Sequence, residues 1–526
     1  MSSEYFSSVT NTGTLAEKYR KKVTERELYL DRARQCSEVT IPTLITEDSE
    51  TTSELFDTPY QGVGARGVNN LASKLLLTLL PPNAPFFRLS IDNFALKEIE
   101  QDENLKSQIE KGLAEVEKAV MNNIEISNDR VSIFQALKHL IIGGNVLLFL
   151  DKEGIRVFPL SQYVIERDPM GHVLEIVTVA YKVLPEEIQK EIYSQINPEE
   201  NDNKTCDLYT CIKRVNKKFE VHQEVKGVII PDSVGSYDLD KTPYIPLRMI
   251  RVDGESYGRS FVEEMLGDLI SLEGLTKAIV EGASASAKTL FMVSPNGTTR
   301  AKALAESENG AIIEGSAADV SVLQVGKFPD FRVAQETIAK IEQRLSYSFL
   351  LNASVVRDSE RTTAEEVRMV AQELQDSLGG IYGILSQEFQ LPFVKRKINI
   401  LQKSKKLPPL PKGVVFPKVI TGIEALGRSN DRNKLIQFLQ TLNGVLGAEA
   451  IQQYVNVTEA ISRLATADGI ETDGLIRTPE EIQAEAQEQQ EAAQADQQNQ
   501  AVLNAGSQIA GNIPPEAIGQ ALNQNQ

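Results

Sequence analysis

The glycines at 62, 64 and 67 have the G-x-G-x-x-G spacing that lets a backbone approach the pyrophosphate of a dinucleotide. That chemistry requires a buried strand directly before the glycines and an acidic residue about 20 positions after them. Residues 53–60 are polar and contain Pro59, and the helical pattern that follows ends at Pro81 and Pro82. We therefore expect the glycines to serve close helix packing, and we predict no bound cofactor.

Other side chains that could do chemistry are few and scattered. The three histidines, His139, His172 and His222, form no H-E-x-x-H pattern and have no cysteine partner at zinc spacing. Cys206 and Cys211 flank a predicted strand and are interpreted as buried thiols. No P-loop and no G-x-S-x-G pattern occurs. The sequence thus predicts no catalytic residue, no metal ligand and no enzyme activity.

Composition narrows the classes of protein further. The chain has 526 residues, 41% of them hydrophobic, with 55 Lys and Arg against 73 Asp and Glu, which gives a net charge of −18. This acidity argues against tight binding of nucleic acid, which needs a basic face. The N-terminus lacks a signal-peptide pattern, and the apolar runs 75–80 and 140–150 are too short to span a bilayer. We expect a soluble protein.

The elements along the chain alternate between helical and β patterns. Residues 15–36 are charged and helix-like with loosely spaced apolar positions, so we expect this helix to lie on a surface or against a neighbour. Segments 63–80, 105–126 and 131–142 have helical spacing. From residue 145 to 252, alternating and β-branched runs separated by turns predict a small β subdomain.

A helical hairpin is predicted after this subdomain. A helix begins at Glu255 and ends in small residues, an excursion with short strands follows, and a second helix resumes at Ala334. The stretch 352–361 then leads into a long helical tract, with bends expected at Gly379-Gly380 and at Pro392. The fold class is mainly α with a smaller β subdomain, or α+β. A face of small residues on the hairpin would suit a ring of copies, but pattern alone favours an intramolecular bundle.

Several long blocks resemble one protein family. Residues 60–76, 147–168, 248–260 and 363–368, the last followed by 378–388, are similar to the portal (head-to-tail connector) proteins of T7-like short-tailed bacteriophages. The similarity extends from about residue 15 to about residue 480. The resemblance implies a portal architecture of wing, stem, clip and crown, assembled as a ring of twelve copies around a DNA channel at one capsid vertex.

The resemblance also implies how the chain is divided. The wing is at 1–255, with a helical N-terminal part and the β subdomain at about 145–252, and its long helix is at 363–410. The stem helices are at 256–290 and 331–351, with the clip between them at 291–330 and the tunnel loop after them at 352–362. The crown is at 411–480, and a Gln/Ala-rich tail at 481–526 is expected to be disordered or dependent on partners.

The implied function is a channel through which double-stranded DNA is packaged, retained and ejected. Arg357 and Arg361, with Arg368 as a third cation, are the expected contacts of the tunnel with DNA phosphates. The acidity of the chain suits a duplex that must slide, because phosphate contacts would hold the DNA.

The other expected contacts concern assembly and docking. The predicted stem contacts between subunits are Gly282, Ala283, Ala285 and Ala287, and the predicted docking residues of the clip are Asn296, Arg300 and Lys302.

The partners implied by the family are further copies of the chain, double-stranded DNA, the terminase large subunit, the major capsid and scaffolding proteins, tail adaptor or nozzle proteins, and internal core proteins at the crown, with no membrane. The expected location is the virion, after assembly in the host cytoplasm. The alternative is a helical scaffold or adaptor protein without a DNA channel, and a nucleotide-dependent oxidoreductase is the third hypothesis.

Overall fold

The computed structural model describes residues 13–46, 57–82, 86–90, 103–183, 206–286, 290–308, 310–323, 328–351, 369–370, 372–374, 380–407, 418–421, 428–447, 455, 460–461 and 464. The chain divides into two compact units, residues 1–426 and 427–526. Each unit is described by itself.

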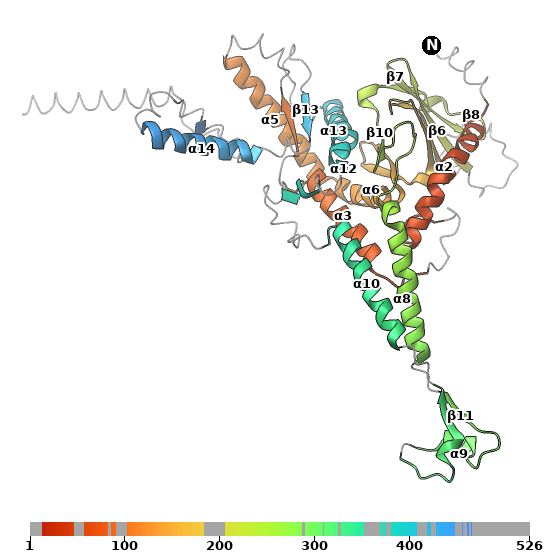
Figure 1. Ribbon diagram of the computed structural model, residues 1–526. Coiled ribbons are helices and arrows are strands. Elements are labelled where there is room, and N and C mark those ends of the chain that lie inside the picture. Colours follow the sequence, from red (N-terminus) through yellow and green to blue (C-terminus); the bar gives the residue numbers. More distant parts are fainter. Residues whose placement is uncertain are drawn as a thin grey trace, which may run out of the picture. The chain divides into compact units, whose positions relative to one another are not determined.

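The first helix, α2 (Leu15–Glu38), begins with a capping box between Thr14 and Glu17. The expectation that this helix lies on a surface holds for its outer side, where Leu28 is 75% exposed, but its inner side has a buried stripe that the sequence pattern did not indicate. The Leu15 amide donates to Oε1 of Glu224 at 2.9 Å, and Lys22 lies 2.7 Å from the Glu166 carboxylate, both of them on strands of the β subdomain. Helix α2 therefore packs against the sheet of its own chain (Figure 1).

The β subdomain holds a three-stranded and a six-stranded antiparallel sheet, so the expected β region is present. The first sheet has the order β10–β2–β3, and the second has the order β4–β5–β6–β7–β8 with β9 also paired to β7. Their strands are β2 (Asn145–Leu150), β3 (Ile155–Phe158), β4 (Tyr163–Arg167), β5 (Val173–Val183), β6 (Cys206–Val215), β7 (Lys218–Val225), β8 (Val228–Ile229), β9 (Gly235–Asp238) and β10 (Tyr244–Arg248). Short 3-10 turns join them at η2 (Leu160–Gln162), η4 (Pro231–Ser233) and η5 (Leu239–Lys241).

The largest hydrophobic core lies among α3 (Val63–Leu79), α5 (Glu103–Ile126) and α6 (Asp129–Gly143), together with strand β2. It is closed by a two-stranded sheet in which β1 (Phe87–Ser90) pairs with β13 (Lys418–Thr421) across more than 300 residues of sequence. Strand β13 falls in the range that the sequence assigns to the crown, yet it hydrogen-bonds to a strand in the range assigned to the wing.

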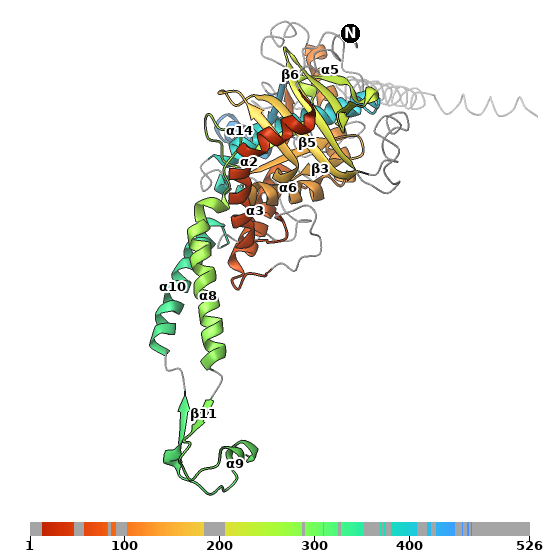
Figure 2. The same ribbon diagram turned by 90° about the vertical axis from the view of Figure 1, so that its right-hand side faces the viewer.

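The helical hairpin consists of α8 (Leu266–Ser286), preceded by η6 (Val262–Met265), and α10 (Phe328–Ser348). The two helices run side by side in both views (Figures 1 and 2). Between them the chain forms a small module, in which β11 (Leu290–Val293) pairs antiparallel with β12 (Val320–Leu323) around α9 (Ala301–Glu306) and η7 (Ala317–Asp319). The order of helix, excursion and helix is the one that the sequence predicts.

The long tract after the hairpin is interrupted at Gly380, whose φ of 91° is left-handed. Helix α12 (Ile381–Leu385) starts there and continues through a π-helical turn, η9 (Ser386–Gln390), into α13 (Leu391–Lys403). A break at the paired glycines was expected, whereas the π turn was not. Such turns insert a residue into the helical ladder and often lie at functional sites.

In the second unit, the structure describes helix α14 (Arg428–Leu446). Across the described residues of both units, every helix is too short or too polar to cross a membrane.

Candidate functional site: the stem hairpin, its module and its base

The two hairpin helices are joined by a close contact and an ion pair. A Cβ built on Gly282 of α8 would lie 2.6 Å from the ring of Phe331 on α10, so a larger residue there would have to displace this ring. Nearer the base, an Arg344 guanidinium nitrogen lies 2.7 Å from the Asp268 carboxylate. The hairpin is thus a paired unit within one chain.

The same hairpin leaves large apolar side chains in solvent. Ile270 is 53% exposed, Val333 66% and Tyr347 77%. Ile270 lies on α8, and Val333 and Tyr347 lie on α10.

The four predicted stem contacts have different positions in the structure. Gly282 packs against Phe331 of its own chain, which gives it an intramolecular function. Ala283 is exposed on α8. Ala285 belongs to α8, but its side chain lies outside the described residues, as does Ala287. A role of these residues between subunits stays a prediction.

The module between the helices is organised by one carboxylate. Oδ2 of Asp319 accepts hydrogen bonds from the Thr298 amide at 2.7 Å and the Thr299 amide at 3.1 Å, and from both threonine hydroxyls. The bonds from Thr299 and Thr298 lower the pKa of Asp319 below its usual range. A Cβ on Gly297 would lie 2.4 Å from this carboxylate carbon, so the turn requires glycine.

The predicted docking residues lie on the surface of this module. Asn296, Arg300 and Lys302 are all exposed, and Lys302 has only a long contact of 3.9 Å with Glu306. The side chain of Ile312 is fully exposed nearby in sequence. The module therefore offers both cationic and apolar groups to a partner.

The start of α8 is held by the segment that precedes it. The amide of Asn145 donates to the Gly258 carbonyl and accepts from the Gly258 amide, each at 2.7 Å. The hydroxyl of Ser260 donates to the Ile141 carbonyl, and the buried Tyr257 hydroxyl accepts from the Ile165 amide. These bonds fix the beginning of the hairpin to α6 and to both sheets.

Helix α3 contacts both hairpin helices. The carboxylate of Glu273 on α8 accepts from the backbone amides of Tyr60 and Gln61, just before α3 begins. Directly after α10, the ring of Phe349 lies so close to α3 that a Cβ on Gly67 would be 2.5 Å from it.

The glycine motif therefore serves helix packing, as expected. A Cβ on Gly64 would meet the Val39 carbonyl oxygen at 2.5 Å, in addition to the close approach of Gly67 to Phe349. Gly62 has no atom within 4 Å of such a Cβ, so only two of the three glycines are needed for packing.

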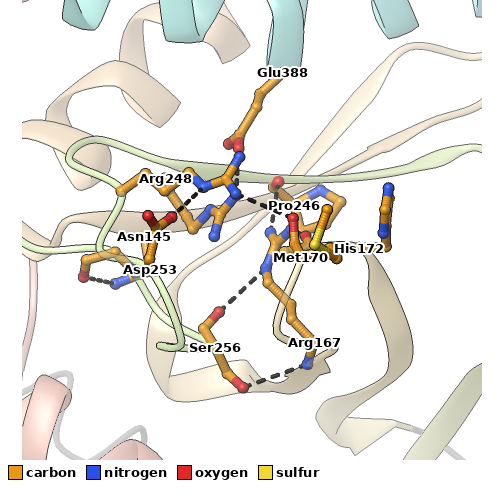
Figure 3. A network of polar contacts seen from close by, with 12 residues as sticks. Asn145, Arg167, Met170, His172, Pro246, Arg248, Asp253, Ser256 and Glu388 are labelled. Carbon is orange, nitrogen blue, oxygen red and sulfur yellow. Dashed lines mark hydrogen bonds and ion pairs between the residues drawn. The ribbon is translucent and has the colours of Figure 1, made fainter.

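A network of arginines joins the β subdomain to the π turn. The buried Arg248 of β10 forms an ion pair with Glu388 of η9, and the two side chains point toward one another in Figure 3. Beside them, Arg167 donates to the carbonyls of Ser256 at 3.2 Å and Gly171 at 3.0 Å. Burial, followed by the neighbouring Arg248 cation, lowers the pKa of Arg167 to about 10, which leaves it charged at neutral pH.

Sequence reasoning did not identify Arg248, Glu388 or Arg167 as a connected group. The available signal was the block 248–260, whose residues hold the start of α8 and contribute to this network. Their long-range partners, at positions 145, 167 and 388, are far apart in sequence, and pattern analysis does not pair such residues.

The predicted tunnel residues Arg357, Arg361 and Arg368 lie outside the described residues. Within the described part of the chain, the structure places no group of three or more His, Cys, Asp or Glu residues that could hold a metal ion.

Comparison with known proteins identifies relatives along nearly the whole chain. A family model described as "Bacteriophage head to tail connecting protein" matches residues 12–476. The portal protein of Escherichia phage T7 is 41% identical over 519 residues, covering 96% of this chain and 95% of its own, and that of Enterobacteria phage T3 is 40% identical with 95% of both covered.

Comparison with solved structures finds matches of low sequence identity. A chain titled "Neck of empty GTA particle computed with C6 symmetry" covers 78% of this chain at 11% identity and a TM-score of 0.37. The relationship rests on the sequence relatives, whose similarity runs from the N-terminal helix through the hairpin and beyond it.

Proposed function

The chain belongs to the bacteriophage head-to-tail connecting protein family, and we propose that it forms the portal ring through which double-stranded DNA enters, stays in and leaves the capsid. The observation that carries the proposal is the end-to-end match with portal proteins at 40 to 41% identity. The protein is accordingly a structural component of the virion at the junction of head and tail.

The exposed apolar side chains of the hairpin support the assembly step. Ile270, Val333 and Tyr347 are each more than half exposed in the described structure, while Gly282 and Asp268 already hold the two helices together. A second copy that packs against the hairpin would bury them. Repeating the contact closes a ring, for which the family implies twelve copies.

In this ring, the wing, stem and clip have the boundaries given by the sequence, whereas the wing also includes strand β13, which pairs with β1. The exposed clip residues Asn296, Arg300 and Lys302 serve first the terminase large subunit and later the tail adaptor or nozzle proteins. The wing and crown contact the capsid, scaffolding and internal core proteins. We assign no catalytic step to the chain, and assembly takes place in the host cytoplasm before the ring becomes part of the virion.

Charge supports the passage of DNA. A dodecamer of a chain with a net charge of −18 carries on the order of −200 formal charges, which repel phosphates wherever cations are not placed to meet them. We propose that Arg357 and Arg361, with Arg368, are such cations and that they contact phosphates without reading bases.

The test removes Arg357 and Arg361 together as alanine substitutions. We expect the rings of this variant to assemble normally. Because salt screens phosphate contacts, genome retention or packaging yield should change more at low than at high ionic strength. The matched control is Lys217→Ala with Lys218→Ala, which removes two exposed cations from the β6–β7 turn. Wild-type packaging and retention at all salt concentrations would show that the arginines are surface charges only.

A further inference from the structure

Helix α10 ends in an unusual turn. The Leu351 amide donates to the Ser346 carbonyl at 2.8 Å and the Leu350 amide to the Tyr347 carbonyl at 3.1 Å, a hydrogen-bond pattern that normally has glycine at its left-handed position. Here that position is Leu350, with a φ of 54°. A branched side chain is strained in this conformation, so surrounding contacts must hold it.

Two side chains of α3 supply those contacts. The amide of Asn70 donates to the carbonyls of Phe349 at 3.0 Å and Leu350 at 3.1 Å. One turn later on the same face of α3, the ammonium of Lys74 donates to the Leu350 carbonyl at 3.2 Å. The carbonyls of Phe349 and Leu350, directly after α10, are thereby satisfied.

Lys74 also reaches the chain on the far side of segment 352–368. Its ammonium lies 3.5 Å from the carboxylate of Glu373. The Lys74 side chain is only 2% exposed, whereas that of Glu373 is 35% exposed. A lysine this deeply buried is uncommon in proteins unless it has a partner, and this one has partners on both ends of the segment.

We propose that Lys74 is a positioning residue that fixes where segment 352–368 leaves the stem and where it rejoins the wing. Of these three side chains, Asn70 bonds to the first end of the segment and Glu373 lies at its second end. Lys74 contacts both ends. Helix α3 itself is anchored at its far end, because Gln390 donates to the Leu79 carbonyl at 2.8 Å. The ends of the segment are thus tied to the largest core of the subunit.

The consequence for the channel rests on the proposed function. If Arg357 and Arg361 meet DNA, the distance between the two ends of their segment limits how far the arginines can extend. Lys74 then limits the reach of both arginines by holding the two ends of their segment.

The test is hydrogen exchange on assembled full-length rings, followed by mass spectrometry of peptides covering 345–351 and 369–374. Lys74→Met should accelerate exchange in both peptides by about tenfold, the effect of losing one local contact. Asn70→Leu should accelerate only the first peptide, and Glu373→Gln only the second. The control is Lys397→Met, because Lys397 is also a buried lysine with a carboxylate partner, Asp129, and it should change neither peptide.

The pattern distinguishes positioning from general stability. Equal acceleration throughout the chain in Lys74→Met, or an unchanged second peptide, would overturn the proposal. Should Lys74→Met fail to assemble, the separate effects of Asn70→Leu and Glu373→Gln still decide, since acceleration of both peptides by either variant contradicts the assignment of the ends. If exchange follows the expected pattern but Lys74→Met particles retain their genome normally, Lys74 fixes the ends of the segment but does not influence the contact of Arg357 and Arg361 with DNA.

Discussion

Substitution of Gly67 by alanine tests the close contact between α3 and the stem. The new Cβ would lie 2.5, 2.7 and 2.9 Å from three ring atoms of Phe349, all near the attachment of the ring to its own backbone. The ring has little freedom to retreat, because Phe349 is fully buried and its centroid is 5.8 Å from that of Phe261 in an edge-to-face arrangement. The substitution must therefore displace helix α10 or the ring.

Two effects determine how much Gly67→Ala changes the free energy of unfolding. Replacing glycine by alanine inside a helix stabilises it by about 1 kcal/mol. Overpacking a filled core costs about 1 to 3 kcal/mol. We expect Gly67→Ala to destabilise the subunit by about 1 kcal/mol, as the difference between these terms.

The matched control is Gly112→Ala in α5, where a Cβ would meet no atom within 4 Å. Only the helical gain applies there, so this variant should be stabilised by about 1 kcal/mol. The assay is urea unfolding of assembled rings at equal concentration, followed by circular dichroism, with the shift of the midpoint as the readout. If Gly67→Ala is as stable as Gly112→Ala, the close approach of α3 to Phe349 does not exist.

The remaining predictions concern the arginine network, a buried histidine, the stem and the clip. Arg248→Met should destabilise the subunit by about 3 to 5 kcal/mol, because it leaves the Glu388 carboxylate partly buried without its cation, and the double variant with Glu388→Gln should recover part of this loss in urea unfolding. Burial lowers the pKa of His139 to about 4, so the unfolded chain binds its proton first as pH falls below about 6.5. The wild type should lose up to about 3 kcal/mol between pH 6.5 and 4 through this group, and His139→Gln should lack that part of the pH dependence. Ala285→Leu should weaken ring formation by about 1 to 3 kcal/mol per contact, measured as the mass distribution in solution, and an unchanged ring population would count against a subunit contact at this face. Deletion of residues 296–305 should leave rings intact and abolish DNA packaging, whereas normal packaging would show that the clip lies elsewhere.

The strands of the β subdomain could be predicted because their pattern is local. Alternating apolar residues bounded by turns predicted the β subdomain at 145–252, where the structure has strands β2 to β10. The helix, excursion and helix order of the hairpin likewise follows from spacing in the sequence. These features need no knowledge of what the elements contact.

Burial of α2 could not be predicted because charged residues occupy its buried stripe. Leu15, Tyr19, Arg26 and Leu30 lie on one face, and the sequence pattern is broken at Arg26. In the structure, the Arg26 guanidinium donates to the Tyr19 hydroxyl and to the Ser161 carbonyl, both at 2.8 Å, which allows it to be buried. A pattern based on apolar residues misses every such position.

The contact between Lys74 and the end of α10 could not be predicted either, because it too depends on a buried charged residue. Lys74 interrupts an apolar helix and would ordinarily be assigned to the surface, yet its partners lie more than 270 residues away. Buried cations that are satisfied by distant carbonyls and carboxylates become visible only in three dimensions.

The central claim is that copies of this chain surround a channel, and its most direct test is imaging of the purified full-length protein by electron microscopy with native mass spectrometry of the same sample. The account predicts closed rings with an axial hole and a mass corresponding to about twelve subunits, as expected for a closed cyclic assembly. A population of monomers or dimers, or closed particles without an axial hole, would contradict it.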